Sequence, residues 1–309
     1  MVVKMGHEPG PTGPAVLRGG PVPSLTFRGR TWNRDRAMVM AIVNRTPDSF
    51  YDHGVTFAEQ AARDRITAVV REGADVIDIG GVPASPGTEV TEQEEIDRVV
   101  PTVEWARREF PDVVISVDTF RAGPAEAVCA AGADLVNDNW AAADGGILDV
   151  AARYGAGYVS AHTDHVTPRT EPHRPRYADV LGTVVTQTVA LAEKAVAAGV
   201  PAGGILIDPA IDFSKNTLHS LQVLRGIEEM VATGWPVLLA MSNKTVVGES
   251  LAVPLEERLT GTLAATAIAA DRGVAMVRAH QARATRETCE MVATVRGERR
   301  PSRAVRLLA

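Results

Sequence analysis

The sequence is poor in cysteine and in aromatic residues. Its 309 residues include two cysteines, Cys129 and Cys289, and aromatic side chains make up 5% of the chain. Two cysteines are too few for a disulfide framework or a cysteine-based zinc site, and they suit a reducing compartment. Ala, Val and Gly are abundant instead, as is typical of small, closely packed βα units.

The chain also lacks an excess of basic residues and a long apolar run. Its 32 Lys and Arg against 38 Asp and Glu leave a formal charge of −6, whereas a DNA-binding domain usually carries a basic patch. No apolar run approaches the ~18 residues that span a membrane, and the N-terminus has no apolar segment of a signal peptide. We therefore expect a cytoplasmic protein that binds neither nucleic acid nor membrane.

The two ends of the chain differ from its centre. Residues 1–23 are rich in Pro and Gly and predict a disordered tail, and residues 24–36 predict a short hairpin at the start of the domain. Residues 297–309 carry several arginines, which predict a solvated basic tail. The segment between the tails, 24–296, is long enough for one α/β barrel.

Short apolar runs alternate with amphipathic stretches from Ala37 onward. Near-continuous apolar runs are typical of parallel strands that are buried on both faces, and Thr91 with Glu94 forms a capping-box motif at the start of one helix. The alternation occurs about eight times over roughly 260 residues, which predicts a TIM (β/α)8 barrel. The predicted strands are 38–44, 74–81, 113–119, 135–139, 157–163, 204–209, 236–242 and 274–280.

An open, doubly wound sheet is the alternative fold. Such a sheet usually carries a Gly-rich phosphate turn after its first strand. Here the first strand is followed by Asn-Arg-Thr-Pro, residues 44–47. The sequence therefore favours the barrel.

Polar side chains stand at the end of every predicted strand. The carboxyl ends of barrel strands form the active-site face, so a ring of polar residues there predicts a ligand site. Asp118, Asn137 and Asp208 offer acceptors to the N–H donors of a flat heterocycle, and Lys244 can donate to ring acceptors.

A second group of polar residues lies where the first and last strands meet. Asn44, Arg278 and His280 predict a cationic and polar cluster that suits a phosphate or diphosphate.

These strand-end motifs resemble those of dihydropteroate synthases. The segments 40–52 and 77–81 resemble the first two motifs of that family, and 116–119, 136–138, 161–162, 208–216, 241–244 and 277–280 follow in order. The resemblance covers about residues 38–295. It implies a TIM barrel, often a homodimer, that condenses 6-hydroxymethyl-7,8-dihydropterin diphosphate with the arylamine p-aminobenzoate and releases diphosphate.

The resemblance also implies a role for each site residue. Charge that develops on the departing diphosphate would be stabilised by Arg, His and Mg²⁺, so no enzyme nucleophile is needed. The implied pterin contacts are Asp118, Asn137, Asp208 and Lys244; the diphosphate contacts are Asn44, Arg278 and His280; the Mg²⁺ ligands are Asn44 and Asp52; and the p-aminobenzoate side is Phe213, Thr245 and Pro86.

The departures from the family pattern gather around the second substrate. Ala84 and Ser85 stand where the family has Thr and Arg, Asn243 replaces an Arg, and Gln281 replaces an Asp. Residues 210–214 read Ala-Ile-Asp-Phe-Ser in place of Gly-Phe-Gly-Phe-Gly, and Arg45 replaces an apolar residue.

The lost arginines predict weak or lost synthase activity, because an Arg–carboxylate contact is worth roughly 1.5–3 kcal/mol. We also expect that Thr245 begins a helix whose backbone N–H groups could still meet a substrate carboxylate.

Three functions remain open at this point. The chain is an active synthase, a non-catalytic or retuned pterin- and diphosphate-binding paralogue outside folate synthesis, or a pterin-dependent methyltransferase barrel, which the diphosphate cluster disfavours. A zinc site at His162, His165 and His173 is disfavoured because prolines make that segment a loop. The Ala- and Leu-rich stretch 255–270 predicts a helix that packs against either a second copy of the chain or the protein's own core.

Overall fold

The computed structural model describes residues 24–47, 54, 56–164, 166–170 and 176–303. The predicted tail 1–23, the predicted metal ligand Asp52, and His165 and His173 lie outside the described residues.

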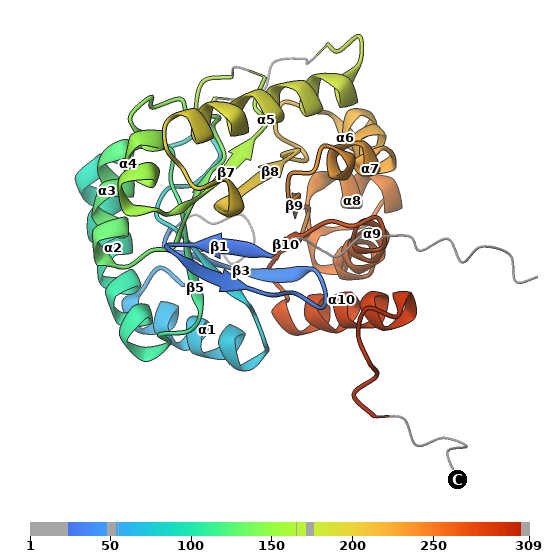
Figure 1. The fold of residues 1–309 in the computed structure, drawn as a ribbon, viewed down its shortest axis with the longest axis horizontal. Helices are drawn as coiled ribbons and strands as arrows, with labels where there is room; N and C mark the ends of the chain where they lie inside the picture. The colour runs from blue at the N-terminus through green and yellow to red at the C-terminus, as the bar shows by residue number, and fades with distance from the viewer. Residues whose placement is uncertain (1–23, 48–53, 55, 165, 171–175, 304–309) are drawn as a thin grey trace, which may run out of the picture.

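Eight parallel strands form a closed barrel, as predicted (Figure 1). The first barrel strand, β3, pairs with both β4 and β10. A parallel bridge between Ile207 and Val237 joins β8 to the segment that enters β9 and completes the ring. The strands are β3 Met38–Asn44, β4 Val76–Gly80, β5 Val114–Asp118, β6 Leu135–Asp138, β7 Gly157–Ala161, β8 Ile205–Asp208, β9 Leu238–Ala240 and β10 Met276–Ala279.

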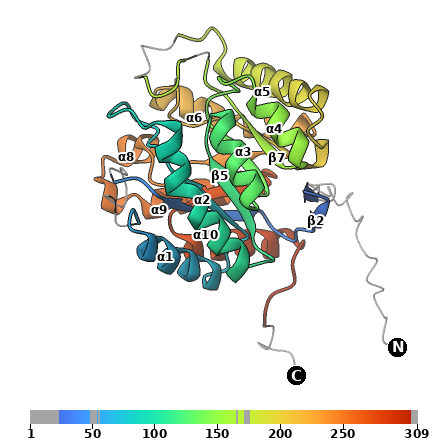
Figure 2. The same ribbon diagram turned by 90° about the vertical axis from the view of Figure 1, so that its left-hand side faces the viewer.

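The helices surround the strands as an outer layer (Figures 1 and 2). The predicted capping box is present, because Thr91 Oγ1 accepts from the Glu94 N–H and the Glu94 side chain accepts from the Thr91 N–H. The helices are α1 Glu59–Arg71, α2 Glu92–Glu109, α3 Ala122–Ala131, α4 Ile147–Tyr154, α5 Val180–Ala197, α6 Thr217–Arg225, α7 Ile227–Ala232, α8 Thr245–Leu251, α9 Leu259–Asp271 and α10 Ala282–Arg296, with 3-10 turns at Ala202–Gly204 and Leu255–Glu257.

The predicted N-terminal hairpin closes one end of the barrel. Its strands, β1 Leu25–Phe27 and β2 Arg30–Trp32, are antiparallel. Leu25 and Phe27 are fully buried and pack with the side chains that fill the amino end of the barrel, such as Met38 and Met276. The first residue of β7 is Gly157. A Cβ at this position would lie 2.4 Å from the Phe27 ring, so the close packing of the hairpin requires a residue without a side chain here.

Helix α5 is as long and as apolar as a membrane span, with a mean hydropathy of 1.2 over 18 residues. The sequence analysis recognised no such run. Val184, Ala192 and Ala195 are buried on its inner face, and the helix packs against β7 and β8. The barrel core thus accounts for part of its apolar character, since 33% of this stretch is buried.

The late helices differ from the prediction for residues 255–270. Helix α8 already follows β9, and 255–270 is divided into a 3-10 turn and α9 after Pro254. The buried face of α9 consists of Thr262, Thr266 and Ala269, not of its leucines. Helix α8 ends at Leu251, where Ala252 adopts a left-handed conformation, and Pro254 precedes the 3-10 turn.

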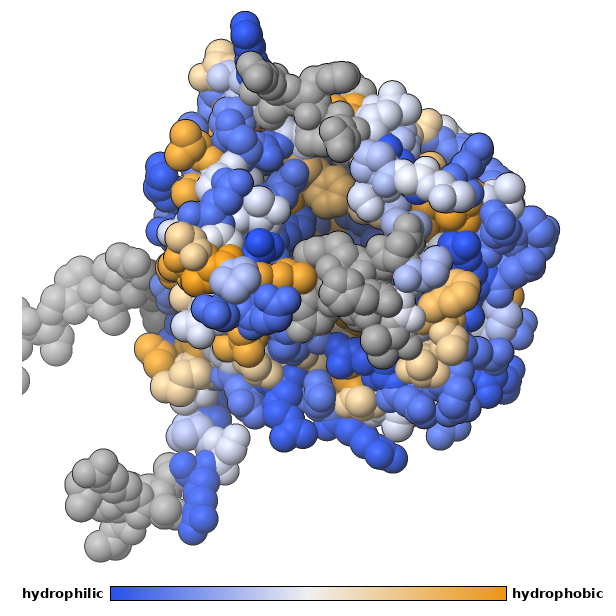
Figure 3. Space-filling model, turned by 180° about the vertical axis from the view of Figure 1, so that it is seen from behind, coloured by the Kyte–Doolittle hydropathy of each residue, from blue (hydrophilic) through white to orange (hydrophobic). Residues whose placement is uncertain are grey.

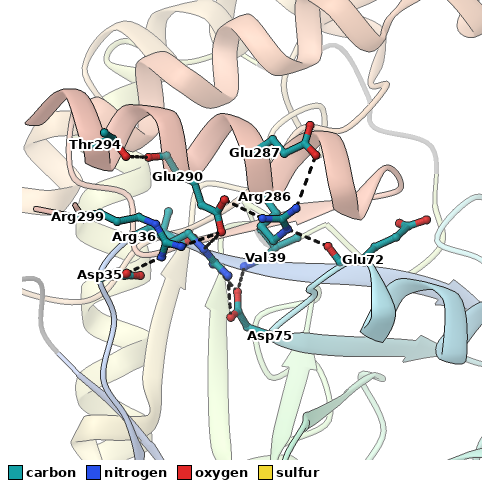
Figure 4. Close-up of polar contacts among 11 residues, drawn as sticks. Asp35, Arg36, Val39, Glu72, Asp75, Arg286, Glu287, Glu290, Thr294 and Arg299 are labelled. Carbon is teal, nitrogen blue, oxygen red and sulfur yellow. Dashed lines mark hydrogen bonds and ion pairs between the residues drawn. The ribbon is translucent and has the colours of Figure 1, made fainter. Parts of the chain in front are cut away.

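An ion-pair cluster fastens the C-terminal helix to the amino end of β3 and β4 (Figure 4). Arg36 pairs with Asp75 at 2.6 Å and lies 3.8 Å from Glu290 of α10. Arg299 pairs with Glu290 at 3.4 Å and with Asp35 at 2.5 Å. The prediction that Arg299 is a solvated charge is therefore wrong, because two carboxylates hold it against the barrel.

Candidate functional site

A cavity of ≈ 400 Å³ opens at the carboxyl ends of the strands. Figure 3 shows this face, which is hollowed near its centre. Asn137 does not line the cavity but lies beside it, paired in register with Asp118 on the neighbouring strand. The predicted residues that line it are Asn44, Pro86, Asp118, Asp208, Phe213, Lys244, Thr245, Arg278 and His280.

Asp78 lies at the centre of the polar network beneath this cavity. It is fully buried in β4 and accepts hydrogen bonds from Ser116 Oγ at 2.6 Å, Asn137 Nδ2 at 3.0 Å and Arg278 Nε at 2.6 Å. Asp78 was expected only as a polar strand-end residue of the 77–81 motif, without a ligand contact of its own. The sequence does contain a signal for its importance. Asp78 stands between Ile77 and Ile79 in an apolar strand, and a charge that is buried there requires partners.

Arg278 bridges two carboxylates. Its Nη2 donates to Asp118 Oδ2 at 2.9 Å while its Nε holds Asp78. Burial alone would lower the pKa of Arg278, but Asp78 and Asp118 raise it, so the guanidinium stays charged. Within the described part of the chain, Nη1 has no hydrogen-bond partner and is the atom that can meet an anion.

Asp118 is the less strongly paired of the two carboxylates. Burial raises the pKa of Asp118 to about 7, Arg278 opposes this rise and Asp78 adds to it. Its side chain keeps 24% of its surface exposed, whereas Asp78 keeps none. Asp118 is therefore easier to protonate than an ordinary aspartate, and the fully buried Asp78 holds Arg278 at the shorter distance, 2.6 Å against 2.9 Å.

His280 is neutral, which corrects the predicted cationic cluster. Burial lowers the pKa of His280 to about 3, and Arg278 and Arg65 lower it further. Its backbone N–H donates to Ser242 Oγ at 3.1 Å. The charge of this cluster thus comes from Arg278, and His280 can offer only a neutral imidazole.

Two strand-end residues have groups suited to a heterocycle. Asn137 Oδ1 is buried and has no hydrogen-bond partner among the described residues, a state that costs roughly 1–3 kcal/mol. Asp208 accepts from the Ala210 N–H at 2.7 Å, and burial raises its pKa while Lys244 opposes the rise. An N–H donor on a ligand would satisfy Asn137.

Lys244 and Phe213 form one wall of the cavity. Lys244 Nζ donates to the Ile211 carbonyl oxygen and lies 4.9 Å from the centre of the Phe213 ring. Burial lowers the pKa of Lys244, and Asp212 and Asp208 counteract this. The ammonium is thereby held over the ring at the edge of the cavity.

Lys215 fixes the loop that follows β8. Its Nζ donates to the carbonyl oxygens of Phe213 at 3.0 Å and Ala210 at 3.3 Å, and it lies 2.8 Å from His162 Nδ1. Burial lowers the pKa of Lys215 to about 7. His162 is thus bonded to a lysine, and the described residues contain no group of three His, Cys, Asp or Glu side chains that could hold a metal.

Asp212 fills the position that we expected to meet a substrate carboxylate. Its Oδ2 accepts from the Val246 N–H, in the first turn of α8, at 3.2 Å. The expectation that this part of the helix next to Thr245 could serve a substrate is therefore wrong for the Val246 N–H, because the protein's own carboxylate holds it.

The remaining departures from the synthase pattern fall into two groups. Ala84 and Ser85 line the cavity, where the missing side chains would face a ligand. Asn243 is buried outside it, and its Nδ2 donates to Gln281 Oε1 at 3.3 Å. The Asn243 side chain thus contacts α9 and Gln281 and does not face the cavity.

Arg45 also faces away from the cavity. Its Nε donates to the Arg98 carbonyl oxygen at 3.1 Å and its Nη1 to that of Phe57. The side chain is buried between the first loop and α2, so it stabilises this loop and leaves the cavity unobstructed.

The described residues are compatible with a Mg²⁺ ion held mainly by substrate oxygens. Mg²⁺ usually keeps several waters and uses one or two carboxylates together with phosphate oxygens. Asn44 Oδ1 lies near the cavity floor, 3.8 Å from the position of a Cβ on Gly80. Asn44 alone would be a weak ligand, so diphosphate oxygens and Asp52 would have to supply the rest.

Comparison with known proteins agrees with this geometry. Residues 40–280 match the family model described as "Pterin binding enzyme". The chain is 56% identical over 288 residues to the "Inactive dihydropteroate synthase 2" of Mycobacterium tuberculosis, covering 92% of this chain and 91% of that protein. It is 36% identical over 255 residues to the "Dihydropteroate synthase" of Streptococcus pyogenes, covering 81% of this chain and 92% of that protein.

The same agreement holds for a solved structure. The Yersinia pestis dihydropteroate synthase, in complex with a sulfonamide drug, superposes with a TM-score of 0.84 at 37% identity, covering 89% of this chain and 100% of that chain. The chain therefore belongs to the pterin-binding enzyme family and is of the dihydropteroate synthase type.

Proposed function

We propose that this protein binds a dihydropterin diphosphate in the barrel cavity and is a dihydropteroate synthase-type transferase whose activity on p-aminobenzoate is weak or lost. The observation that carries the proposal is the division of the cavity. The pterin-side groups Asp118, Asn137, Asp208 and Lys244 remain together, whereas the p-aminobenzoate side has lost two polar side chains at Ala84 and Ser85.

The retained residues support binding and charge stabilisation at the pterin. Asn137 Oδ1 and Asp208 offer acceptors to ring N–H groups, and Lys244 holds a positive charge at the edge of the ring site. Arg278 Nη1 is directed to a diphosphate as the bond to the pterin methylene breaks, and His280 donates or accepts a hydrogen bond as a neutral group.

Mg²⁺ is part of the proposal as the ion that neutralises the diphosphate. Asn44 and Asp52 would hold it together with the oxygens of the substrate. Among the described residues, the guanidinium placed at the departing charge is that of Arg278, which two carboxylates already neutralise. A bound divalent cation would therefore raise affinity for the diphosphate more than for the bare pterin.

We further propose a cytoplasmic homodimer. Cys129 and Cys289 are free and buried, which suits a reducing compartment. Ile268, Met291 and Val295 are 54%, 61% and 74% exposed on α9 and α10, and these adjacent apolar side chains support pairing of two copies through the late helices. Light scattering should give the mass of a dimer for the wild type and of a monomer for Ile268→Glu. Leu218→Glu, on exposed α6, should remain dimeric.

Pterin binding and synthase activity are tested separately. Titration of the protein with 7,8-dihydropterin should show binding that is weakened about tenfold in Asn137→Ala, since a hydrogen bond to a ligand is lost. The exposed Asn33→Ala serves as the control and should bind as the wild type does. A diphosphate-release assay with p-aminobenzoate should show little or no turnover. Absence of pterin binding would contradict the proposed function, and turnover of about 1 s⁻¹ or faster would contradict the loss of activity.

A further inference from the structure

The loop after β8 keeps a glycine-like backbone without its glycines. Ala210, Asp212 and Ser214 have φ angles of +49°, +68° and +51°, and they occupy alternate positions of the segment where the family usually has Gly. The left-handed region is unfavourable for residues with a Cβ. Specific contacts must therefore hold this loop in place.

The side chain of Asp212 supplies several of those contacts. Its Oδ2 accepts from the Val246 N–H at 3.2 Å, its Oδ1 accepts from Ser220 Oγ at 3.3 Å, and its own N–H donates to Ser220 Oγ at 3.3 Å. The carboxylate is thus tied to both α6 and α8. It is a fixed charge and cannot swing away from an incoming ligand.

This fixed carboxylate lines the cavity next to Phe213 and Thr245. These two residues form the wall assigned to the second substrate. Asp208 lies on the same side of the barrel, at the end of β8. A ligand group on this wall therefore meets carboxylates.

The cations of this region are already engaged. Lys244 Nζ donates to the Ile211 carbonyl oxygen and lies over the Phe213 ring. Arg169 donates to the carbonyl oxygens of Ser85 and Thr88, and Arg278 is held by Asp78 and Asp118. Among the described residues that line the cavity, the one guanidinium is that of Arg278, whose Nε and Nη2 are paired and whose Nη1 is assigned to the diphosphate.

We propose that Asp212 determines the charge specificity of the second-ligand site, so that the site accepts an amine with a neutral or cationic ring substituent and rejects an aryl carboxylate. This inference rests on the proposed pterin site, because the second ligand would bind beside the bound pterin. It explains a loss of p-aminobenzoate use by repulsion from an added negative charge as well as by the missing donors at Ala84 and Ser85.

The test uses three amines of the same shape and different charge. 4-Aminobenzoate is anionic, 4-aminobenzamide is neutral and 4-aminobenzamidine is cationic. Their affinities would be measured by calorimetry for protein saturated with 7,8-dihydropterin, Mg²⁺ and inorganic diphosphate. The wild type should bind the benzoate at least about tenfold more weakly than the other two.

Two variants assign that preference to Asp212. Asp212→Asn removes the charge, keeps an acceptor for the Val246 N–H and should reduce the difference between benzamidine and benzoate by about tenfold. Asp212→Gly fits the positive φ and should do the same. Asp112→Asn removes one exposed charge at the amino end of the barrel, where Asp112 precedes β5 and lies 3.3 Å from Arg30 of β2, and should leave the preference unchanged.

The outcomes separate this inference from the proposed function. Tightest binding of the benzoate by the wild type, no binding of any of the three amines, or an unchanged order in both Asp212 variants would overturn the role of Asp212. Failure of 7,8-dihydropterin itself to bind, seen in the preceding titration, would instead overturn the proposed function.

Discussion

Asn243 donates a hydrogen bond to Gln281, with 3.3 Å between Nδ2 and Oε1, so two positions at which the chain departs from the synthase pattern touch each other. The family usually has Arg and Asp there, which are of opposite charge. A neutral amide pair thus stands where the family pattern has residues of opposite charge.

The first prediction concerns this pair. Asn243→Arg alone should destabilise the protein by about 3–5 kcal/mol, because it buries an unpaired charge. Adding Gln281→Asp should recover about 1–3 kcal/mol of that loss, because residues in contact are coupled. Urea unfolding of the two single variants and the double variant measures this coupling. Additive effects of the two substitutions would show that the residues do not act as a pair.

The second prediction concerns the cavity wall at Ala84 and Ser85. The double substitution Ala84→Thr and Ser85→Arg should increase synthase activity with p-aminobenzoate, chiefly through a lower KM. A charge-assisted contact is worth about 1.5–3 kcal/mol, or roughly 10–150-fold, but Asp212 should keep the gain near the lower limit.

The matched control combines Ala84→Thr with Ser85→Gln. Glutamine provides a long side chain without charge, so this variant should show little gain in activity. Adding Asp212→Gly to the Thr–Arg double variant should increase activity further. No gain in either background would mean that the strained 210–214 segment prevents turnover for another reason.

The third prediction is a pH dependence of diphosphate binding. Asp118 has its pKa raised to about 7, so above this pH its carboxylate is ionised and holds Arg278, and below it the neutral acid releases the Nη2 donor. Inorganic diphosphate should therefore bind more tightly as the pH falls from 8 to 6. Asp118→Asn removes this titration and leaves those of the diphosphate and of Lys215, whose pKa is lowered to about 7, so the pH dependence should become shallower than in the wild type. Parallel pH profiles of the wild type and Asp118→Asn would contradict the assignment.

The same raised pKa has a consequence for stability. The native protein binds the Asp118 proton more tightly than the unfolded chain, whose carboxyl pKa is about 3.9. Asp118 therefore makes the protein progressively less stable as the pH rises from about 4 to about 7. Asp118→Asn should lessen this fall in unfolding free energy.

The fourth prediction concerns the ion-pair cluster between the barrel and α10. Asp75→Ala should lower the unfolding free energy by about 3 kcal/mol, because it leaves Arg36 mostly buried without its main partner. Asp112→Ala breaks the exposed Arg30–Asp112 pair, whose side chains are 44% and 97% exposed, and should cost less than about 1 kcal/mol. Equal losses in the two variants would show that the cluster contributes no more than an ordinary surface pair.

The barrel was predictable from sequence because its strands have a simple physical signature. A parallel strand covered on both faces must be apolar along its length, and residues such as Val39, Ile77 and Val117 meet that condition. Helix ends were harder to predict. The regular spacing of Leu255, Leu259 and Leu263 favoured one helix from residue 255, but the first residues form a 3-10 turn and α9 begins at Leu259.

The sequence predicted which residues belong to the site, but it did not predict which of them bond to one another. Strand-end positions identified Asp118, Arg278 and His280, since all carboxyl ends meet at one face. The pairing of Arg278 with Asp78 and the neutral state of His280 depend on burial and on neighbours from distant strands, which sequence spacing does not contain. The contact of Asp212 with α8 likewise joins residues 34 positions apart.

The hairpin that carries Leu25 and Phe27 has a consequence for the order of events in the cavity. It closes the amino end of the barrel, so ligands enter and leave through the carboxyl-end mouth. Asn137 and Asp208 are each 1% exposed, whereas Phe213 is half-buried and Thr245 is exposed, so we expect a bound amine to stand between the pterin and solvent. Catalysis, or binding of the two ligands without catalysis, would then follow a compulsory sequence in which the pterin arrives first and cannot depart before the amine.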